Sequence, residues 1–209
     1  MALANYTDLK ASVASWLNRS DLTSQIPDFI ALAEAQFNRV LRTRQMLVRN
    51  TGYTISSQYT ALPSDFLQLD NIKIANGTGE SGLEHLAVND YTDKLRSFAN
   101  ATGTPGYYSI IGGYLAVARI PDVSYTGEML YFGSIPAMSA NATNWLLTKH
   151  PDLYLYGALL QSAPYLKEDE RVEVWRSMYG TAMAEIQLEE ERARFSGAPP
   201  RTISRRVIG

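Results

Sequence analysis

The sequence has no cysteine and only two histidines among its 209 residues. Without cysteine the chain forms no disulfide and offers no thiol nucleophile, zinc ribbon or iron–sulfur cluster. A compact chain of this length buries roughly 70% of the surface that its unfolded state exposes, so its core needs no disulfide or structural metal ion for stability. We therefore expect a fold held together by apolar packing, without a cofactor.

Long apolar runs are also absent. No stretch approaches the ~18 consecutive apolar residues that a membrane-spanning helix needs, so we expect no membrane partner. The first residues have neither a basic start nor an unbroken apolar segment, which predicts that they are not a signal peptide.

Common catalytic motifs are missing as well. The sequence has no HExxH, GxSxG or GxxxxGK[ST] spacing, which argues against zinc proteases, serine hydrolases and P-loop enzymes. The glycine-rich run at 77–82 lacks a lysine and a clear following helix, so we interpret it as a surface turn. His85 has one carboxylate beside it, too few ligands for a metal, and His150 precedes Pro151 at a predicted helix start, where we expect it to cap. We therefore predict that the protein is not an enzyme.

Charge is unevenly distributed along the chain. The formal net charge is −2, yet the residues after Glu191 include five arginines and no acid, so the remainder carries −7. These arginines are Arg192, Arg194, Arg201, Arg205 and Arg206. A basic end on an acidic body predicts an arm that docks outside its own domain.

Two acidic runs lie at the two ends of the longest predicted helix. They consist of Glu168, Asp169 and Glu170, and of Glu189, Glu190 and Glu191. One interpretation is an ordinary solvated helix face. The alternative is a channel-facing acidic surface that repels the phosphates of DNA, which would suit a protein that lines a passage.

Helical periodicity marks the beginning of the chain. Residues 6–17 place apolar side chains three and four positions apart, which predicts a helix with Asn5 or Thr7 as its N-cap. A second helix is predicted over 26–44, with Pro27 in its first turn, where the missing N–H would be unpaired anyway. Its apolar stripe is predicted to consist of Phe29, Leu32, Ala33, Phe37, Val40 and Leu41.

The middle of the chain, from about residue 46, has the composition of strands. Strands are predicted within 46–56, 66–76 and 125–136, and residues 58–65 are interpreted as a turn-rich connection. Two further β-rich runs flank Gly112-Gly113, which predicts a hairpin with a two-residue loop. A short helix is predicted to begin near Asn89.

Helical periodicity returns at residue 144. The helix predicted from Pro151 is apolar nearly all round and should be the most buried. The longest helix follows, with a seam of Val172, Trp175, Tyr179, Ala182 or Met183, and Ile186. Residues 196–209 contain prolines and glycines but no amphipathic period, so we expect no structure of their own.

These elements together predict an α+β fold that is mainly α. Helices of 1–45 and 145–191 are expected to pack as an antiparallel bundle, because neither terminal pair can bury its apolar stripe alone. Residues 46–144 would form a small antiparallel β-rich insertion. Residues 192–209 would form an extended C-terminal arm.

The order of these segments resembles a known family. Its main parts are IPDFIALAEAQFNRVLR near the N-terminus, LPSDFLQL after the first strand, and the helices from TNWLLTKHPDLYLYGALL to SMYGTAMAEI. Over about residues 5–190, this ordered combination resembles the head-to-tail adaptor (connector) proteins of tailed bacteriophages, especially those of short-tailed phages.

The resemblance implies a non-enzymatic structural protein of the virion. Such adaptors form rings, typically of twelve copies, beneath the portal protein at one capsid vertex. They extend the channel through which genomic DNA passes, without sequence-specific binding, and offer a platform for tail or nozzle proteins. The implied location is the head–tail interface of the virion, after assembly in the host cytoplasm. For this chain the resemblance implies a portal-docking arm that includes Arg194, Arg201, Ile203, Arg205, Arg206, Val207 and Ile208.

Two other functions stay open on the sequence. A DNA-binding protein would use the basic C-terminal tail to bind phosphates, with a steep salt dependence. Against this stand the acidic body and the lack of any aromatic residue after Phe195 for stacking on bases. A tail-associated hydrolase or glycan-binding protein would use the β-rich insertion, although no catalytic constellation supports it.

Overall fold

The computed structural model describes residues 3–75, 77, 79–99, 101–166 and 170–195. Its contacts divide the chain into two compact units, of which one comprises Met1–Arg44 and Ile135–Gly209 and the other Gln45–Ser134. The predicted arm lies outside the described residues from 196 onwards, and the last helix continues to Phe195.

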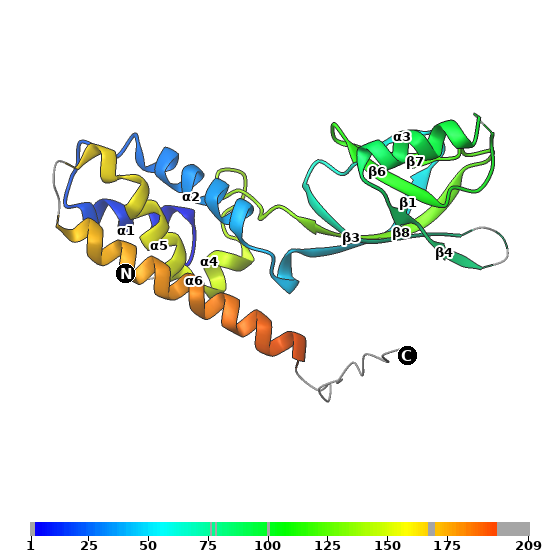
Figure 1. Cartoon of the computed structure of the whole chain (residues 1–209). Helices are drawn as coiled ribbons and strands as arrows, with labels where there is room; N and C mark the ends of the chain where they lie inside the picture. Colours follow the sequence, from blue (N-terminus) through cyan, green and yellow to red (C-terminus); the bar gives the residue numbers. More distant parts are fainter. Residues whose placement is uncertain (1–2, 76, 78, 100, 167–169, 196–209) are drawn as a thin grey trace. The chain divides into compact units, whose positions relative to one another are not determined.

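In the part of the chain that the structure describes, the first unit is helical (Figure 1). Its helices are α1 (Tyr6–Leu17), α2 (Ile26–Val40), α4 (Trp145–Lys149), α5 (Pro151–Gln161) and α6 (Arg171–Phe195), with 3₁₀ turns at Arg44–Met46 and Ala163–Tyr165. The predicted starts are confirmed: Asn5 caps α1 by accepting the N–H of Asp8 at 3.0 Å, and Pro27 and Pro151 lie in the first turns of α2 and α5.

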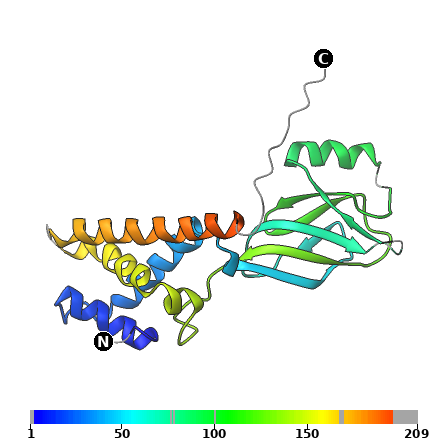
Figure 2. The same ribbon diagram turned by 90° about the horizontal axis from the view of Figure 1, so that it is seen from below.

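Helix α5 is the centre of this unit. It packs against α1, α2, α4 and α6, and Leu153, Tyr154, Ala158 and Leu159 are fully buried. A helix with neighbours on several sides has no face left for polar residues, which explains why its sequence is apolar nearly all round. Figure 2 shows α6 (orange) running beside α5 (yellow).

Helices α2 and α5 meet at Gly157. A Cβ atom at this position would lie 2.8 Å from Cζ of Phe37 and 3.4 Å from Cβ of Ala33. The ring of Phe37 also packs edge-to-face on Tyr154, with ring centroids 5.2 Å apart, and stacks on Tyr179 at 6.4 Å. The missing side chain of Gly157 therefore lets the two helices approach closely around one aromatic cluster.

A buried carboxylate joins α2 to the segment that precedes α4. Glu34 Oε1 accepts the backbone N–H of Met138 at 2.8 Å and the hydroxyl of Tyr154 at 3.1 Å. Asn144 donates to the same hydroxyl at 2.6 Å and caps α4 by accepting the N–H of Leu147 at 2.8 Å. Burial raises the pKa of Glu34 above its ordinary value, although the two hydrogen bonds oppose this shift by favouring the carboxylate.

The second unit contains two four-stranded sheets within the described residues. The first has the order β1-β8-β3-β4, and all its pairs are antiparallel. The second has the order β2-β7-β6-β5, with a parallel pair between β5 and β6. The elements are β1 (Leu47–Ile55), β2 (Tyr59–Ala61), β3 (Phe66–Ala75), β4 (Glu80–Gly82), β5 (Glu84–His85), α3 (Val88–Ser97), β6 (Tyr107–Ile111), β7 (Tyr114–Ala118) and β8 (Tyr125–Gly133).

The two sheets share one core, and α3 covers the other face of the second sheet (Figure 1). Strand β7 connects both layers because alternate residues of a strand point to opposite faces. Leu115 and Val117 join the core between the sheets, whereas Ala116 and Ala118 pack against Tyr91 of α3. The small alanine side chains thus allow the helix to lie close to the strand.

The predicted glycine hairpin is confirmed. Strands β6 and β7 pair antiparallel, from Tyr107 opposite Ala118 to Ile111 opposite Tyr114. Gly112 and Gly113 form the loop with φ angles of 57° and 84°. These left-handed conformations cost glycine little, so the sequence places the turn unambiguously.

The predicted fold class, by contrast, is wrong. The β-rich part is not a small antiparallel insertion, because it contains two four-stranded sheets and one of them is mixed. The helices surround α5 and do not form a clear antiparallel bundle. Strands β2, β4 and β5 have only three, three and two residues, too few to show an alternating pattern. Strand β2 even lies inside the run interpreted as a turn.

The predicted stripe of α2 is also wrong at two positions. Leu32 and Val40 are 52% and 49% exposed, whereas Ile26 and Ile30, which the predicted stripe did not include, are buried. The apolar seam predicted for the longest helix is confirmed in part. Trp175, Ala182, Met183 and Ile186 are buried on α6, whereas Val172 and Tyr179 are only partly buried.

Gly157→Ala is expected to lower the free energy of unfolding by about 1–3 kcal/mol, because the added methyl group overpacks the contact with Phe37. The higher helix propensity of alanine, worth about 1 kcal/mol, offsets this only in part. Gly180→Ala on α6 is the matched control, since a Cβ there meets nothing within 4 Å; it should stabilise by up to about 1 kcal/mol. Urea unfolding measures both changes, and an equal gain for both variants would contradict the close approach at Gly157.

Glu34→Gln is expected to change the pH dependence of stability. A carboxyl group with a raised pKa holds its proton more tightly in the folded state, so the wild-type protein loses stability as the pH rises from the unfolded pKa through the folded pKa. Glutamine does not ionise, yet it still offers an acceptor to Met138 and Tyr154. The stability of the variant relative to wild type should therefore increase between about pH 4 and about pH 7, as measured by urea unfolding.

Glu34→Ala serves as the comparison for this test. It leaves the N–H of Met138 and the hydroxyl of Tyr154 without their acceptor, which costs about 1–3 kcal/mol for each buried group at either pH. If the stability of the glutamine variant relative to wild type instead fell with rising pH, the buried site would favour the carboxylate, contrary to the direction of the pKa shift.

Candidate functional site

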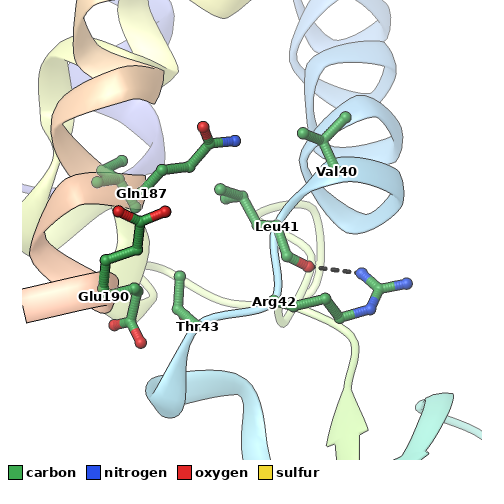
Figure 3. A pocket seen from close by; sticks show the side chains of 8 residues that line it. Val40, Leu41, Arg42, Thr43, Gln187 and Glu190 are labelled. Carbon is green, nitrogen blue, oxygen red and sulfur yellow. Dashed lines mark hydrogen bonds between the residues drawn. The ribbon is translucent and has the colours of Figure 1, made fainter. Parts of the chain in front are cut away.

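A groove lies between the end of α2 and the last turns of α6 (Figure 3). It encloses about 210 Å³, several times the ~30 Å³ that one water molecule occupies in the liquid. Its walls are formed by Val40, Leu41, Arg42, Thr43, Ile186, Gln187, Glu190 and Glu191. We call this feature the α2–α6 groove.

The end of α2 gives the groove its apolar floor. The helix stops at Leu41, which is extended at φ −78° and ψ 137° and donates its N–H to the carbonyl of Phe37 at 2.8 Å. Leu41 and Ile186 of α6 are buried. Val40, the last helical residue, remains about half exposed at the rim. The groove therefore combines buried aliphatic side chains with one aliphatic side chain that is open to solvent.

Most of the charged groups around the groove are already paired. Arg42 donates to the carbonyls of Asn38 and Leu41 at 2.9 and 2.5 Å, and in Figure 3 its guanidinium points away from Glu190. Glu190 Oε2 accepts the backbone N–H of Arg44 at 3.0 Å and lies 3.4 Å from its Nε. Because only 13% of the Glu190 side chain is exposed, this contact ties α6 to the chain that leaves α2.

Three polar side chains of the groove, those of Thr43, Gln187 and Glu191, have no such partner within the described part of the chain. Thr43 is buried, and its Oγ1 makes no hydrogen bond to any residue that the structure describes. Glu191 is exposed and forms no ion pair within the described part of the chain. The groove thus offers an apolar floor, a hydroxyl group and a carboxylate. This combination suits an aliphatic side chain with a cation next to it, and it includes no pair of nucleophile and base.

The predicted acidic residues lie at opposite ends of α6. Glu170 is exposed just before the helix, and Glu189 and Glu191 are exposed near its other end; Glu168 and Asp169 lie outside the described residues. At 1.5 Å per residue, Glu170 and Glu190 are about 30 Å apart along the helix. The described members of the two runs therefore do not lie together, and the orientation of the acidic residues towards a channel stays a prediction.

The predicted arm residues are only partly described. Arg194 belongs to α6 through its backbone. The remaining predicted contacts lie outside the described residues: Arg201, Ile203, Arg205, Arg206, Val207 and Ile208. Their docking role stays a prediction.

The two histidines lie in different units of the structure. His150 occupies the N-cap position of α5, but its side chain makes no capping hydrogen bond, so the predicted capping by the imidazole is wrong. His85 packs edge-to-face on Tyr108, with ring centroids 5.2 Å apart. Among the described residues, no three acidic or histidine side chains gather as metal ligands, and none of the helices there is both long and apolar enough to cross a bilayer.

The sequence did not reveal the α2–α6 groove. Thr43 and Ile186 are separated by more than 140 positions in the sequence, and no local period connects them. The nearest signal in the sequence was the aliphatic pair Val40 and Leu41 at the end of the second helix. Two successive residues point to different sides of a helix, so only one of them was expected to be buried.

The comparison with known families covers both units of the structure. The SU10 adaptor protein family matches residues 4–203. No curated protein matches the chain. A phage adaptor family has portal and tail proteins as its partners in general, and the head–tail interface of the virion as its general location. The resemblance to phage head-to-tail adaptors is thereby confirmed, and the chain belongs to the SU10 adaptor protein family of bacteriophage structural proteins.

Proposed function

We propose that the protein forms a ring, of twelve copies, that binds the portal protein and continues the DNA channel towards the tail. The family match over residues 4–203 carries this proposal, because it spans the helical unit and the β-rich unit together. In this role the protein needs no catalysis and no cofactor. It would assemble in the host cell, carry tail or nozzle proteins, and let genomic DNA pass without reading its sequence.

The C-terminal arm is the proposed docking element for the portal. Its distal part, 201–208, contains three arginines and three aliphatic residues and no acid, so it can form ion pairs and apolar contacts side by side. A segment that becomes ordered only on binding gains little affinity per unit area, yet it can wrap over a long surface. Repetition around a ring multiplies such weak contacts into a durable attachment.

The acidic end of α6 is the proposed channel-facing element. Glu189 and Glu191 are exposed there, and residues 1–191 together carry a net charge of −7. A like-charged wall weakens the binding of DNA phosphates and so lets the genome slide. A structure of the assembled ring with these two side chains away from the channel would contradict this part of the proposal.

Removal of the arm is expected to abolish retention of the cognate portal protein in a pull-down. The truncated protein should end at Phe195, because α6 continues to that residue, and its circular dichroism should keep the helix content of the full chain. Two full-length variants separate the contributions: Arg201, Arg205 and Arg206 changed to serine, and Ile203, Val207 and Ile208 changed to serine. We expect each to weaken retention by about tenfold or more, since each removes several contacts per copy.

Two outcomes would contradict this role of the arm. Equal retention of the full-length and truncated proteins would show that another surface binds the portal. If neither protein retained the portal, but the full-length protein shifted DNA at low salt and released it at high salt, the DNA-binding alternative would replace the adaptor proposal.

A further inference from the structure

The α2–α6 groove has no task in portal docking as proposed above. We propose that in the free protein it binds the chain's own C-terminal segment, residues 203–208, and so holds the arm back until a portal is present. The role in holding the arm back rests on the proposed function, whereas the binding of the segment to the groove does not.

The chemistry of the segment matches that of the groove. The sequence ISRRVI at 203–208 has aliphatic residues at both ends and two arginines between them. Val207 or Ile208 fits the apolar floor at Leu41 and Ile186, while a neighbouring arginine reaches the exposed carboxylate of Glu191. The hydroxyl of Thr43, which is buried without a partner among the described residues, can bind a polar backbone group of the incoming segment.

The charges of the groove favour a cation at one place. Arg42 is engaged with two backbone carbonyls, and Arg44 is paired with Glu190. These three charged groups are satisfied within the helical unit, so the carboxylate of Glu191 is the one left to attract an arginine. An exposed ion pair of this kind is weak, which makes the contact reversible.

The length of the chain favours its own segment over that of a second copy. The groove residues of α6, from Ile186 to Glu191, lie four to nine positions before Phe195, about 6–14 Å along the helix. The seven residues 196–202 span up to about 23 Å when extended. The segment can therefore return to its own groove, where a short linker gives an effective concentration of the order of millimolar.

Disulfide trapping tests this inference in the full-length protein, because the chain has no cysteine of its own. One variant carries Gln187→Cys in the groove wall together with Val207→Cys. The matched control carries Glu185→Cys with Val207→Cys; residue 185 is exposed on α6 and outside the groove, about 200° around the helix from residue 187. Both variants are oxidised with oxidised glutathione, and the closure rate is followed on non-reducing gels.

We expect the 187–207 pair to close about tenfold faster than the 185–207 pair, at a rate independent of protein concentration. Adding Glu191→Lys to the first variant should slow closure several-fold, whereas Glu189→Lys, a matched reversal outside the groove, should not. Equal closure rates for the two pairs would overturn the inference. Cross-linked dimers that increase with protein concentration would overturn it too, because a second copy would then supply the segment.

The portal pull-down separates this inference from the proposed function. If the 187–207 pair closes quickly and the closed protein still retains the portal, the groove binds the segment but the arm is not the docking element. If the pair closes no faster than the control, while the full-length protein retains the portal and the protein that ends at Phe195 does not, the arm docks as proposed and the groove inference is wrong.

Discussion

The close approach of α2 and α5 at Gly157 is the constraint on which the helical unit depends. It places the ring of Phe37 against the backbone of α5, inside a cluster with Tyr154 and Tyr179. The polar contact lies directly beside this apolar one, because Glu34 precedes Phe37 by about one helical turn and its carboxylate accepts the hydroxyl of Tyr154. The same carboxylate accepts a hydrogen bond from the N–H of Met138. The contact between α2 and α5 therefore positions these two helices and the segment before α4.

The α2–α6 groove is a consequence of this arrangement. Helix α2 is anchored along its buried face up to Phe37, and the chain turns away at Leu41. Helix α6 packs on α5, and Glu190 holds the backbone N–H of Arg44. The groove between them has an apolar floor because Leu41 follows the end of α2 and Ile186 belongs to α6.

The two proposals together have the arm change partners, and weak, reversible contacts suit such an exchange. A segment that carries both arginines and aliphatic residues suits both proposed binding sites, the groove on its own chain and a surface of the portal, since each needs only a few ion pairs and apolar contacts. Binding within one chain has the advantage of proximity, whereas binding within an assembled ring has the advantage of many copies. The number of contacts that each site offers can then decide when the arm leaves the groove for the portal, without any chemical step.

The sequence by itself determined the starts of the helices, the glycine hairpin and the family. Pro27, Pro151 and Gly112-Gly113 act through local backbone geometry, and Asn5 acts through a hydrogen bond to the N–H of Asp8, so none of them needs a distant neighbour. The family could be identified because the order of the segments spans almost the whole chain.

Only the tertiary structure decided the extent of the sheets, the burial within α2 and the existence of the groove. Strands β2 and β5 have three and two residues, so their pairing depends on the strands beside them and not on their own pattern. Leu32 and Val40 are exposed because none of the described elements covers their side of α2, and a helical period alone cannot predict this. Thr43 and Glu191 meet through contacts between distant segments, and such contacts have no local signature in the sequence.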